Sequence, residues 1–343
     1  MIEPPLITTV ITTFERPKLL RRAIESAQRQ TLSSLTIFVY DSASRNETGE
    51  MVLGMAKKDP RIKYFRHPNR VTAVQNYQFG IDRVKTPFFS LLSDDDYLLP
   101  QFYEKALHFL NKYPSAQFFL GSTIDADTNG KPISALARNW PDREYLLPFE
   151  GLPLAIRSYI NWTGALYRTN PAQKLPLNPN VVPGDYDFIL RLAAQYPFAF
   201  SPHPCAVFTH HAGSFSSHCG LKLIYPSLFD IAKSIYPLRP EGERPQIKIA
   251  FDLFFLRSAL RIGIQNLIHK DLGELELLSQ AIRAACPTYF LGKILPPLFD
   301  FLRQSSFFRF LFLSAFFFYR RCKSLRVKRY LRCLQSENSS RAA

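Results

Sequence analysis

Residues 6–30 of the chain read LITTVITTFERPKLLRRAIESAQRQ. The first eight, Leu6 to Thr13, are mostly apolar or β-branched and predict a buried β-strand. From Pro17 to Gln30 the apolar residues recur with helical spacing, and Pro17 takes a first-turn position where its missing N–H is harmless. The recurring apolar residues are Leu20, Ala23, Ile24 and Ala27. A buried strand followed by an amphipathic helix predicts one unit of an α/β sheet.

The same alternation continues to about residue 120. Strands joined through helices imply right-handed crossovers and a mostly parallel sheet with helices on both faces. Ligands of such sheets bind beyond the carboxyl ends of the strands, so we expect an α/β fold with a Rossmann-like half. Further strands are predicted at Leu35–Tyr40, Ile62–Arg66, Phe88–Leu92 and Ala116–Leu120, and helices near Met51–Ala56, Val71–Val84 and Gln101–Lys112.

The second half of the chain changes character twice. From Ala126 to Pro183 it breaks into short, proline-punctuated pieces, before an expected helix at Asp185–Gln195 and a strand at Ala206–Thr209. After Cys219 the pattern is helical, with a proline-rich break at Tyr236–Pro245. We expect three regions: an α/β domain at residues 1–220, a helical C-terminal region at 221–300 and a basic aromatic tail at 301–343.

Positive charge is concentrated near the C-terminal end. The 343 residues include 43 Lys and Arg against 28 Asp and Glu, a formal charge of +15, and 46% are hydrophobic, as in a folded protein. From residue 301 onward ten Lys or Arg accompany one acidic residue, Glu337, so this tail carries +9. A bias confined to one aromatic-rich tail favours an anionic membrane surface over nucleic acid as the partner.

The tail is too short in uncharged residues to span a bilayer. Ten uncharged residues, Phe310 to Tyr319, separate Arg309 from Arg320. A spanning helix needs about 20. We therefore expect a surface-lying segment, with aromatic rings among the headgroups and basic residues on the phosphates. The alternative is that the Phe side chains pack within a helical subdomain.

Cysteine usage and the first residues favour the cytoplasm. The five cysteines are odd in number and form no C-x-x-C pair, as expected of reduced thiols. Residues Met1–Pro5 have neither the positive nor the apolar segment of a signal peptide. We therefore expect the folded part of the chain in the cytoplasm.

Three polar loops directly follow predicted strands. They are Thr12–Arg16, Asp41–Ser44 and Ser93–Asp96. On a parallel sheet these loops share one edge, and the three consecutive carboxylates of residues 94–96 repel one another unless a cation neutralises them. Mg²⁺ and Mn²⁺ are hard ions that bind carboxylate and phosphate oxygens together. The alternative is an acidic loop that caps the helix near Gln101.

Four segments in this order resemble glycosyltransferase family 2, whose members have the GT-A fold. They are Val10–Pro17, Asp41–Ser44, Asn69–Asn76 and Leu91–Pro100, and the resemblance extends over roughly residues 4–217. It implies a GT-A catalytic domain at residues 1–220 with a nucleotide-binding half. The implied activity is inverting sugar transfer from a nucleotide-sugar donor with Mn²⁺ or Mg²⁺ as cofactor, the metal stabilising the diphosphate leaving group.

The resemblance implies a donor site built from the strand-end loops. Asp41 matches the aspartate that binds the base or ribose, while Ser42 stands where a second Asp or Asn is usual and leaves the base open. A UDP-sugar is the first expectation. Asn76 matches a residue near the base and sugar, or else lies on a solvated helix face. The implied nucleotide-sugar contacts are Thr12, Thr13, Phe14, Glu15, Asp41, Asn76, Asp94 and Asp95.

The implied metal ligands come from two segments. Asp94 and Asp96 match the Asp-x-Asp signature of the family, and His211 matches a late histidine that contacts metal or diphosphate. Ser93 stands where many members carry the first Asp, so a shift by one would make Asp95 and Asp96 the pair. The alternative for His211 is a structural role.

The resemblance also implies the catalytic base. Asp185 matches an aspartate at a helix start that removes the proton of the acceptor hydroxyl, although Gly184 replaces the Glu that usually precedes it. The alternative for Asp185 is a helix N-cap, and Asp187 is expected to be no more than that.

The resemblance further implies that the acceptor borders Trp162, Thr163 and Gly164. An aromatic face there can stack on a sugar, and core packing is the alternative for Trp162. We expect a saccharide or lipid-linked acceptor in bacterial cell-surface polysaccharide or glycolipid synthesis, and a peripheral enzyme on the cytoplasmic face of the membrane. No nucleic-acid partner is expected.

A second class of function stays open. A non-catalytic GT-A-like scaffold at the membrane would keep the fold and tolerate the departures at Ser42, Ser93 and Gly184. Other enzyme classes lose their usual support, because G-x-x-x-x-G-K-[ST], G-x-S-x-G and H-E-x-x-H are missing from the sequence.

Overall fold

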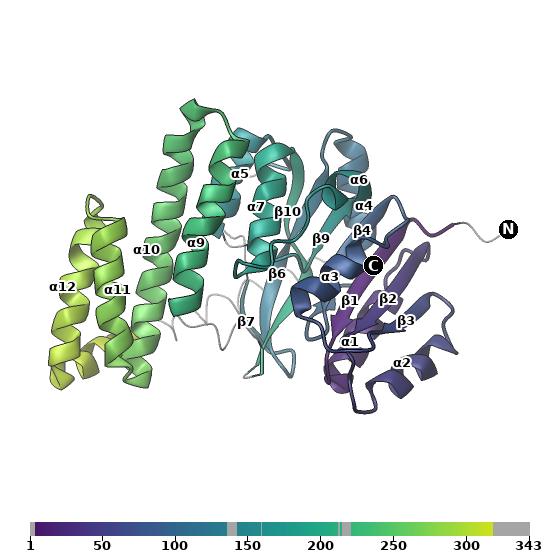
Figure 1. Ribbon diagram of the computed structural model, residues 1–343, viewed down its shortest axis with the longest axis horizontal. Coiled ribbons are helices and arrows are strands. Elements are labelled where there is room, and N and C mark those ends of the chain that lie inside the picture. Colours follow the sequence, from purple (N-terminus) through teal and green to yellow (C-terminus); the bar gives the residue numbers. More distant parts are fainter. Residues whose placement is uncertain (1–3, 136–142, 159, 212, 215–220, 318–343) are drawn as a thin grey trace, which may run out of the picture.

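The computed structural model describes residues 4–135, 143–158, 160–211, 213–214 and 221–317. Ten strands form one sheet in the order β3-β2-β1-β4-β9-β6-β10-β5, with β7 paired to β6 and β8 to β10 (Figure 1). The strands are β1 (Ile7–Thr13), β2 (Leu35–Asp41), β3 (Ile62–Arg66), β4 (Phe88–Ser93), β5 (Tyr97–Leu98), β6 (Phe118–Asp127), β7 (Pro132–Ala135), β8 (Tyr145–Leu146), β9 (Ala165–Arg168) and β10 (Phe198–His210).

The long strand pairings are parallel, which confirms the expected fold class. β2, β1 and β4 pair in parallel, as do β6 and β10, while β9 runs antiparallel between β4 and β6. The helices beside the sheet are α1 (Pro17–Gln28), α2 (Thr48–Ala56), α3 (Ala73–Ile81), α4 (Phe102–Lys112), α5 (Pro148–Ser158), α6 (Thr169–Gln173) and α7 (Gly184–Gln195).

Helices cover both faces of the sheet because the central strands are apolar on both sides. Every residue of β1 is buried. Val10 belongs to a core cluster that includes α3, α5 and α7, whereas Ile7 and Ile11 belong to a second cluster with α1, α2 and α4. Alternate residues of a strand point to opposite faces, so one strand supplies both cores.

The sequence pattern missed several elements between residues 97 and 210. The proline-punctuated stretch contains β7, β8, α5, β9 and α6, and the short β5 lies just after the acidic loop. β10 begins at Phe198 instead of Ala206, because the pairing with β6 shifts register around Pro204 and hides the strand pattern. α3 begins at Ala73, two residues later than expected, since Thr72 and Gln75 form a capping box.

A helical region follows the sheet. It comprises α9 (Leu221–Ile235), η1 (Tyr236–Leu238), η2 (Glu241–Glu243), α10 (Arg244–His269), α11 (Leu272–Ala285), α12 (Phe290–Gln304) and a further helical segment at residues 306–317. α10 packs on α5 and α9 on α7, so one core cluster runs from the sheet to Phe299 of α12. Among the described residues, no helix is both long and apolar enough to cross a membrane.

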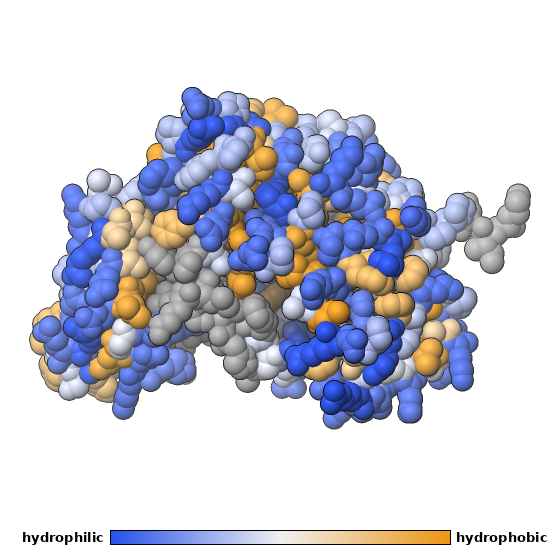
Figure 2. Space-filling view, in the orientation of Figure 1, coloured by the Kyte–Doolittle hydropathy of each residue, from blue (hydrophilic) through white to orange (hydrophobic). Residues whose placement is uncertain are grey.

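The visible surface is largely hydrophilic. Figure 2 shows apolar side chains scattered among hydrophilic ones over this view, including the end of the molecule formed by α11 and α12. The basic residues from Arg320 onward lie outside the described residues, and so do three of the five cysteines. Cys205 and Cys286 are buried free thiols.

Candidate active site

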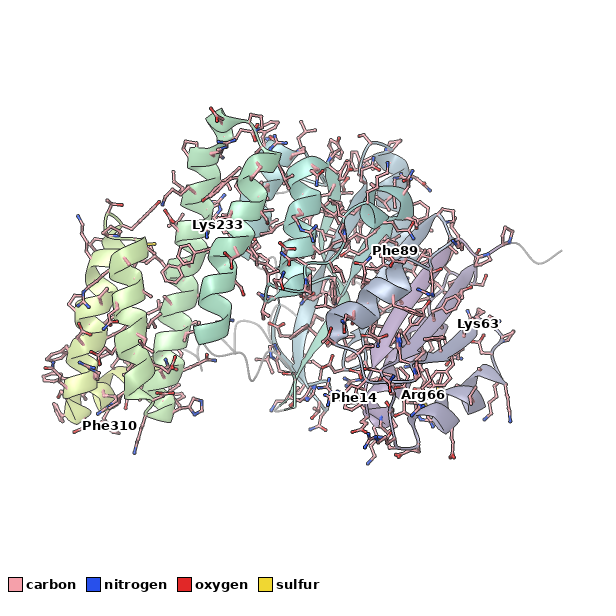
Figure 3. The ribbon with its side chains drawn as sticks, in the orientation of Figure 1. Phe14, Lys63, Arg66, Phe89, Lys233 and Phe310 are labelled. Atoms are coloured by element: carbon pink, nitrogen blue, oxygen red, sulfur yellow. The ribbon has the colours of Figure 1, made fainter. Side chains whose placement is uncertain are left out.

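The strand-end loops meet at one edge of the sheet. Thr13 at the end of β1 is in register with Asp41 at the end of β2, and Thr12 with Ser93 at the end of β4. Figure 3 labels Phe14 at this edge of the molecule. The parallel register brings the three predicted loops together, as the sequence implied.

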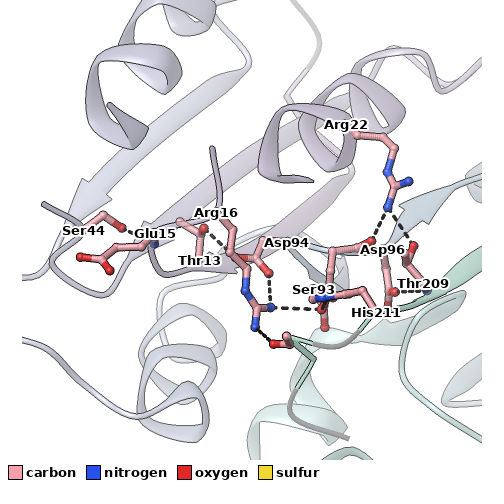
Figure 4. Close-up of polar contacts among 12 residues, drawn as sticks. Thr13, Glu15, Arg16, Arg22, Ser44, Ser93, Asp94, Asp96, Thr209 and His211 are labelled. Carbon is pink, nitrogen blue, oxygen red and sulfur yellow. Dashed lines mark hydrogen bonds and ion pairs between the residues drawn. The ribbon is translucent and has the colours of Figure 1, made fainter. Parts of the chain in front are cut away.

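Hydrogen bonds tie the first loop to the other two. The Thr13 hydroxyl donates to Oδ2 of Asp94 at 2.7 Å, and the Glu15 N–H donates to the Ser44 hydroxyl at 2.8 Å (Figure 4). Glu15 has a φ of +55°, a left-handed conformation that is uncommon for a residue with a side chain. Beside it, the Arg70 guanidinium lies 4.1 Å from the centre of the Phe14 ring.

Asp41 organises the second loop from within. Its side chain is fully buried, and Oδ1 accepts from the Ser44 N–H at 2.9 Å and the Ser44 hydroxyl at 2.6 Å. Oδ2 accepts from the Tyr64 hydroxyl at 2.6 Å. These contacts fix the loop at the residue predicted to bind base or ribose.

Asn76 braces the same region. It is 1% exposed, its amide donates to the Tyr40 carbonyl at 2.9 Å, and its Oδ1 lies 2.9 Å from Nε2 of His67. The side chain therefore links α3 to the ends of β2 and β3, and the solvated alternative for Asn76 is wrong.

Arg16 joins the neighbouring carboxylates of the acidic loop. Its Nη1 donates to Oδ1 of Asp94 at 3.3 Å and to Oδ2 of Asp95 at 3.1 Å, and its Nη2 donates to the Gly213 carbonyl at 2.5 Å (Figure 4). Nε2 of His211 lies 3.0 Å from the same Oδ2 of Asp95. One cationic group thus occupies the point where both carboxylates and the His211 segment converge.

Asp96 faces a different set of partners. Its side chain is fully buried, Oδ2 accepts from the Thr163 hydroxyl at 2.6 Å, and Oδ1 accepts from the Thr209 N–H at 2.8 Å. Asp95, not Asp96, is the carboxylate beside His211. Of the predicted ligands, Asp94 and His211 therefore share their surroundings with Asp95, while Asp96 joins the loop to β10 and to the Trp162–Gly164 segment.

Burial makes the negative charge of this loop costly. Desolvation, and after it the Asp95 charge, raise the pKa of Asp94 to about 6, although Arg16 opposes both effects. Desolvation also raises the pKa of Asp96 well above its ordinary value, with the Asp95 charge as the next cause. A site of this kind gains from a bound cation.

The donor types around Asp95 fit a hard divalent cation. Two carboxylates and an imidazole adjoin, and these groups suit Mg²⁺ or Mn²⁺ in combination with phosphate oxygens. Within the part of the chain that the structure describes, no group of three His, Cys, Asp or Glu is arranged as a metal site. Arg16 would have to leave the carboxylates for such an ion to bind them.

Asp185 stands in the first turn of α7. Its Oδ1 accepts from the Tyr186 N–H at 2.9 Å, and burial raises its pKa to about 6. A Cβ on Gly184 would lie 3.8 Å from Cγ2 of Val74, so α7 begins next to the start of α3. A carboxyl with this pKa is mostly ionised at neutral pH and basic enough to accept a proton.

Asp187 has a structural role different from the expected N-cap. It is fully buried, and its Oδ2 accepts from Nε of Arg191 at 2.8 Å. The Ser234 hydroxyl donates to its Oδ1 at 3.4 Å. Asp187 therefore forms a buried ion pair within α7 and joins α7 to α9 through the hydrogen bond from Ser234.

The predicted acceptor segment lies mostly in the interior. The Trp162 side chain is 8% exposed, and its ring centre lies 4.4 Å from that of Tyr77, so it packs in the core. Gly164 has a φ of +87°, and a Cβ there would lie 3.3 Å from Cβ of Ala206. Among the described side chains, the buried Oδ1 of Asn161 has no hydrogen-bond partner.

Two arginines of this site were missed by the sequence analysis. Besides Arg16, Arg22 of α1 donates from Nη2 to the Asp95 carbonyl at 2.6 Å and to the Thr209 hydroxyl at 2.8 Å. Arg16 directly precedes α1 and Arg22 lies in its middle, but nothing in the local sequence indicates that both contact a loop over 70 residues away. The sequence offered one hint of this contact: Arg16, a basic residue without an assigned role, belongs to a loop expected at the same sheet edge as the acidic loop.

Solved structures with a similar fold include two that hold a nucleotide sugar. TarS from S. aureus, in complex with UDP-GlcNAc, gives a TM-score of 0.61 at 13% identity and covers 81% of this chain and 81% of its own. A mannosyltransferase from Pyrobaculum calidifontis, in complex with GDP-Man and Mn²⁺, gives 0.56 at 13% identity, with 94% and 88% covered. At this identity the likeness establishes the fold, which is that of the GT-A class.

The family follows from sequence similarity. Residues 8–169 match the description Glycosyl transferase family 2, so this segment of the chain belongs to glycosyltransferase family 2. The GalNAc(5)-diNAcBac-PP-undecaprenol beta-1,3-glucosyltransferase of Campylobacter jejuni is 38% identical over 96 residues, 28% of this chain and 31% of that protein. An uncharacterised glycosyltransferase of Rickettsia bellii is 28% identical over 198 residues, 56% of this chain and 28% of that protein. The matches span about a third of these curated relatives.

Proposed function

We propose that this chain is an inverting glycosyltransferase that uses a nucleotide-sugar donor and Mn²⁺ or Mg²⁺. The main observation in support of this proposal is that Asp94, Asp95 and His211 come together at the sheet edge of a family 2 domain. Asp94, Asp95 and His211 would hold the ion, with Asp96 supporting the loop from inside. The bound ion would supply neutralisation of the diphosphate leaving group.

The chain's own groups perform the remaining steps. Thr12 to Glu15, Asp41 and Asn76 would form the nucleotide side of the strand-end site, and Arg16 is placed to pair with the donor phosphates once it leaves the carboxylates. Asp185 accepts the proton of the acceptor hydroxyl as that oxygen attacks the anomeric carbon. Its pKa of about 6 suits a base that must be ionised at neutral pH.

A UDP-sugar is the donor that we propose first. The TarS structure carries UDP-GlcNAc, whereas the archaeal mannosyltransferase carries GDP-Man, so the fold itself accommodates either base. Ser42, whose hydroxyl donates to the Val71 carbonyl at 2.7 Å, is the departure next to Asp41 that bears on the base.

The acceptor that we propose is a saccharide or lipid-linked saccharide of bacterial cell-surface synthesis. The Campylobacter jejuni relative is named for an undecaprenol-linked substrate. The unpaired Asn161 Oδ1 beside Trp162 offers an acceptor atom for a sugar hydroxyl. We further propose that the enzyme works on the cytoplasmic face of the membrane, to which residues 301–343 attach it, and that residues 1–220 and 221–300 are its catalytic and helical regions.

Calorimetric titration with UDP, GDP, dTDP and CDP, each with and without Mn²⁺, tests the donor site. We expect micromolar binding of one nucleotide that disappears without metal and in the Asp95→Ala variant. Asp185→Asn should keep that affinity and lose at least about a hundredfold in turnover, because only the base is removed. Folded protein that binds none of the four nucleotides would favour the membrane scaffold, the second candidate suggested by Ser42, Ser93 and Gly184.

A further inference from the structure

Helix α12 is apolar on two opposite faces. One face, which includes Leu295, Phe299 and Leu302, is buried against α10 and α11. On the other side Phe290 is 75% exposed and Phe301 48%. Ile294 belongs to the same side, because spacings of four and seven residues place side chains on one helical stripe. A surface helix of a soluble protein is normally polar on its outer face.

The following helical segment continues the exposed apolar surface. In residues 306–317, Phe312 and Leu313 pack toward the core, while Phe307 is 65% exposed and Phe310 68%. The rings of Phe301 and Phe308 lie 4.9 Å apart and connect the two helices. We call this surface the Phe face; it consists of Phe290, Ile294, Phe301, Phe307, Phe308, Phe310, Leu311 and Phe317.

The Phe face is not a gap in the internal packing. Partly exposed ion pairs between Arg283 and Asp300 and between Arg303 and Glu276 fasten α12 to α11 beside the buried face. Apart from the contact between the Phe301 and Phe308 rings, the outward side chains are therefore not needed to hold α12 against α11. Figure 3 shows Phe310 at the extreme end of the molecule, far from the strand-end site near Phe14. Monomeric proteins seldom expose so continuous an apolar surface without a partner.

The sequence next to the Phe face indicates the partner. Residues 318–343 contain eight Lys or Arg against Glu337 alone. Phe side chains beside a strongly basic segment match an anionic bilayer, whose acyl boundary takes the rings and whose phosphates take the charges. A second copy of the chain would bring two such basic segments together, which opposes self-association through this face.

We propose that the Phe face seats on an anionic lipid bilayer, with α12 and residues 306–317 lying in the plane of the membrane interface. This inference rests on the membrane attachment proposed above. It assigns the apolar part of the membrane contact to α12 and the helical segment 306–317, in addition to the basic tail. It also leaves the strand-end site, near Phe14, well away from the membrane contact and open to soluble donor.

Sedimentation of the full chain with vesicles tests the inference. Vesicles of phosphatidylglycerol with phosphatidylethanolamine are compared with vesicles of phosphatidylcholine. The variant is Phe307→Ser with Phe310→Ser, and the matched control is Leu53→Ser with Phe149→Ser, whose native side chains are 51% and 47% exposed on helices beside the sheet. Circular dichroism verifies that each variant is folded.

We expect the anionic vesicles to bind the native chain and the control equally, and the Phe variant at least about tenfold more weakly. Equal vesicle binding by the native chain and the Phe variant would overturn the inference. So would sedimentation velocity showing a native dimer that the Phe variant loses, since the partner would then be a second copy. Nucleotide titration separates the two proposals, because the Phe variant should retain native UDP affinity even where vesicle binding is lost.

Discussion

Nη1 of Arg16 lies 3.1 Å from Oδ2 of Asp95, the carboxylate oxygen that also adjoins His211. A divalent ion bound to Asp95 and a guanidinium at this distance cannot share the same oxygen without strong repulsion. Arg16 is therefore a resident counter-charge of the acidic loop, and it competes with any ion that the loop would bind.

Removal of this counter-charge should tighten metal binding. Arg16→Gln is expected to bind Mn²⁺ about tenfold more tightly in the absence of nucleotide, because one charge-assisted contact no longer has to be broken. The same variant should bind nucleoside diphosphate with Mn²⁺ more weakly, since the freed guanidinium is lost as a phosphate partner. Calorimetry measures both, and Arg16→Lys is the control that keeps the charge. Weaker Mn²⁺ binding by Arg16→Gln would contradict the competition and leave Arg16 as an organiser of the loop.

Substitution of Asp95 and of Asp96 should affect stability and metal binding differently. Asp96→Ala leaves the Thr163 hydroxyl and the Thr209 N–H unpaired in the interior, so we expect it to lower the free energy of unfolding by about 2 kcal/mol or more. Asp95→Ala should change stability little, because Asp94 still pairs with Arg16, and should abolish Mn²⁺ binding. Urea unfolding and metal titration of both variants measure the contrast. An equal loss of stability in the two variants would contradict the different roles that we assign to Asp95 and Asp96.

Activity should fall in acid with an apparent pKa near 6. Burial raises the pKa of Asp185 from 3.8 to about 6, and a general base works only when ionised, so kcat/KM should fall about tenfold for each pH unit well below 6. The matched variant is Asp185→Asn, whose residual rate should not follow this profile. A native profile that is flat between pH 5 and about 7 would remove Asp185 from the role of base.

The same shift has a consequence for stability. Because the folded state raises this pKa, the contribution of Asp185 to stability is fully present below the unfolded value of 3.8 and is lost as the pH rises through about 6. Urea unfolding of the native chain and Asp185→Asn across this range should therefore diverge with rising pH, the native chain losing more.

Stability should depend strongly on the buried ion pair between Asp187 and Arg191 in α7. Arg191→Met leaves the fully buried Asp187 carboxylate without its partner and is expected to cost about 3 to 5 kcal/mol of unfolding free energy. Adding Asp187→Leu should recover most of that loss, because no charge then remains buried. Urea unfolding of the single and double variants provides the measurement, and a double variant as unstable as Arg191→Met would show that Arg191 acts through packing.

Much of the fold could be predicted from local patterns. The alternation of apolar strands and amphipathic helices, as in Ile7–Thr13 and Pro17–Gln28, has periods that a single sequence displays. The order of polar loops after strands then places Thr13, Asp41 and Asp94 on one edge, since parallel strands end together. By contrast, β5, β8 and β9 are only two to four residues long and are stabilised by strands distant in sequence. A local sequence pattern therefore could not predict them.

The sequence by itself determined the α/β sheet, the site edge and the family, because these depend on short-range periodicity and on motif order. The tertiary structure alone decided which carboxylate meets which partner. Asp95 meets Arg16 and His211 while Asp96 meets Thr163 and Thr209, contacts that join residues 67 to 116 positions apart. It likewise decided that α12 has an outward apolar stripe, since the sequence shows apolar residues but not which of them the rest of the chain leaves uncovered.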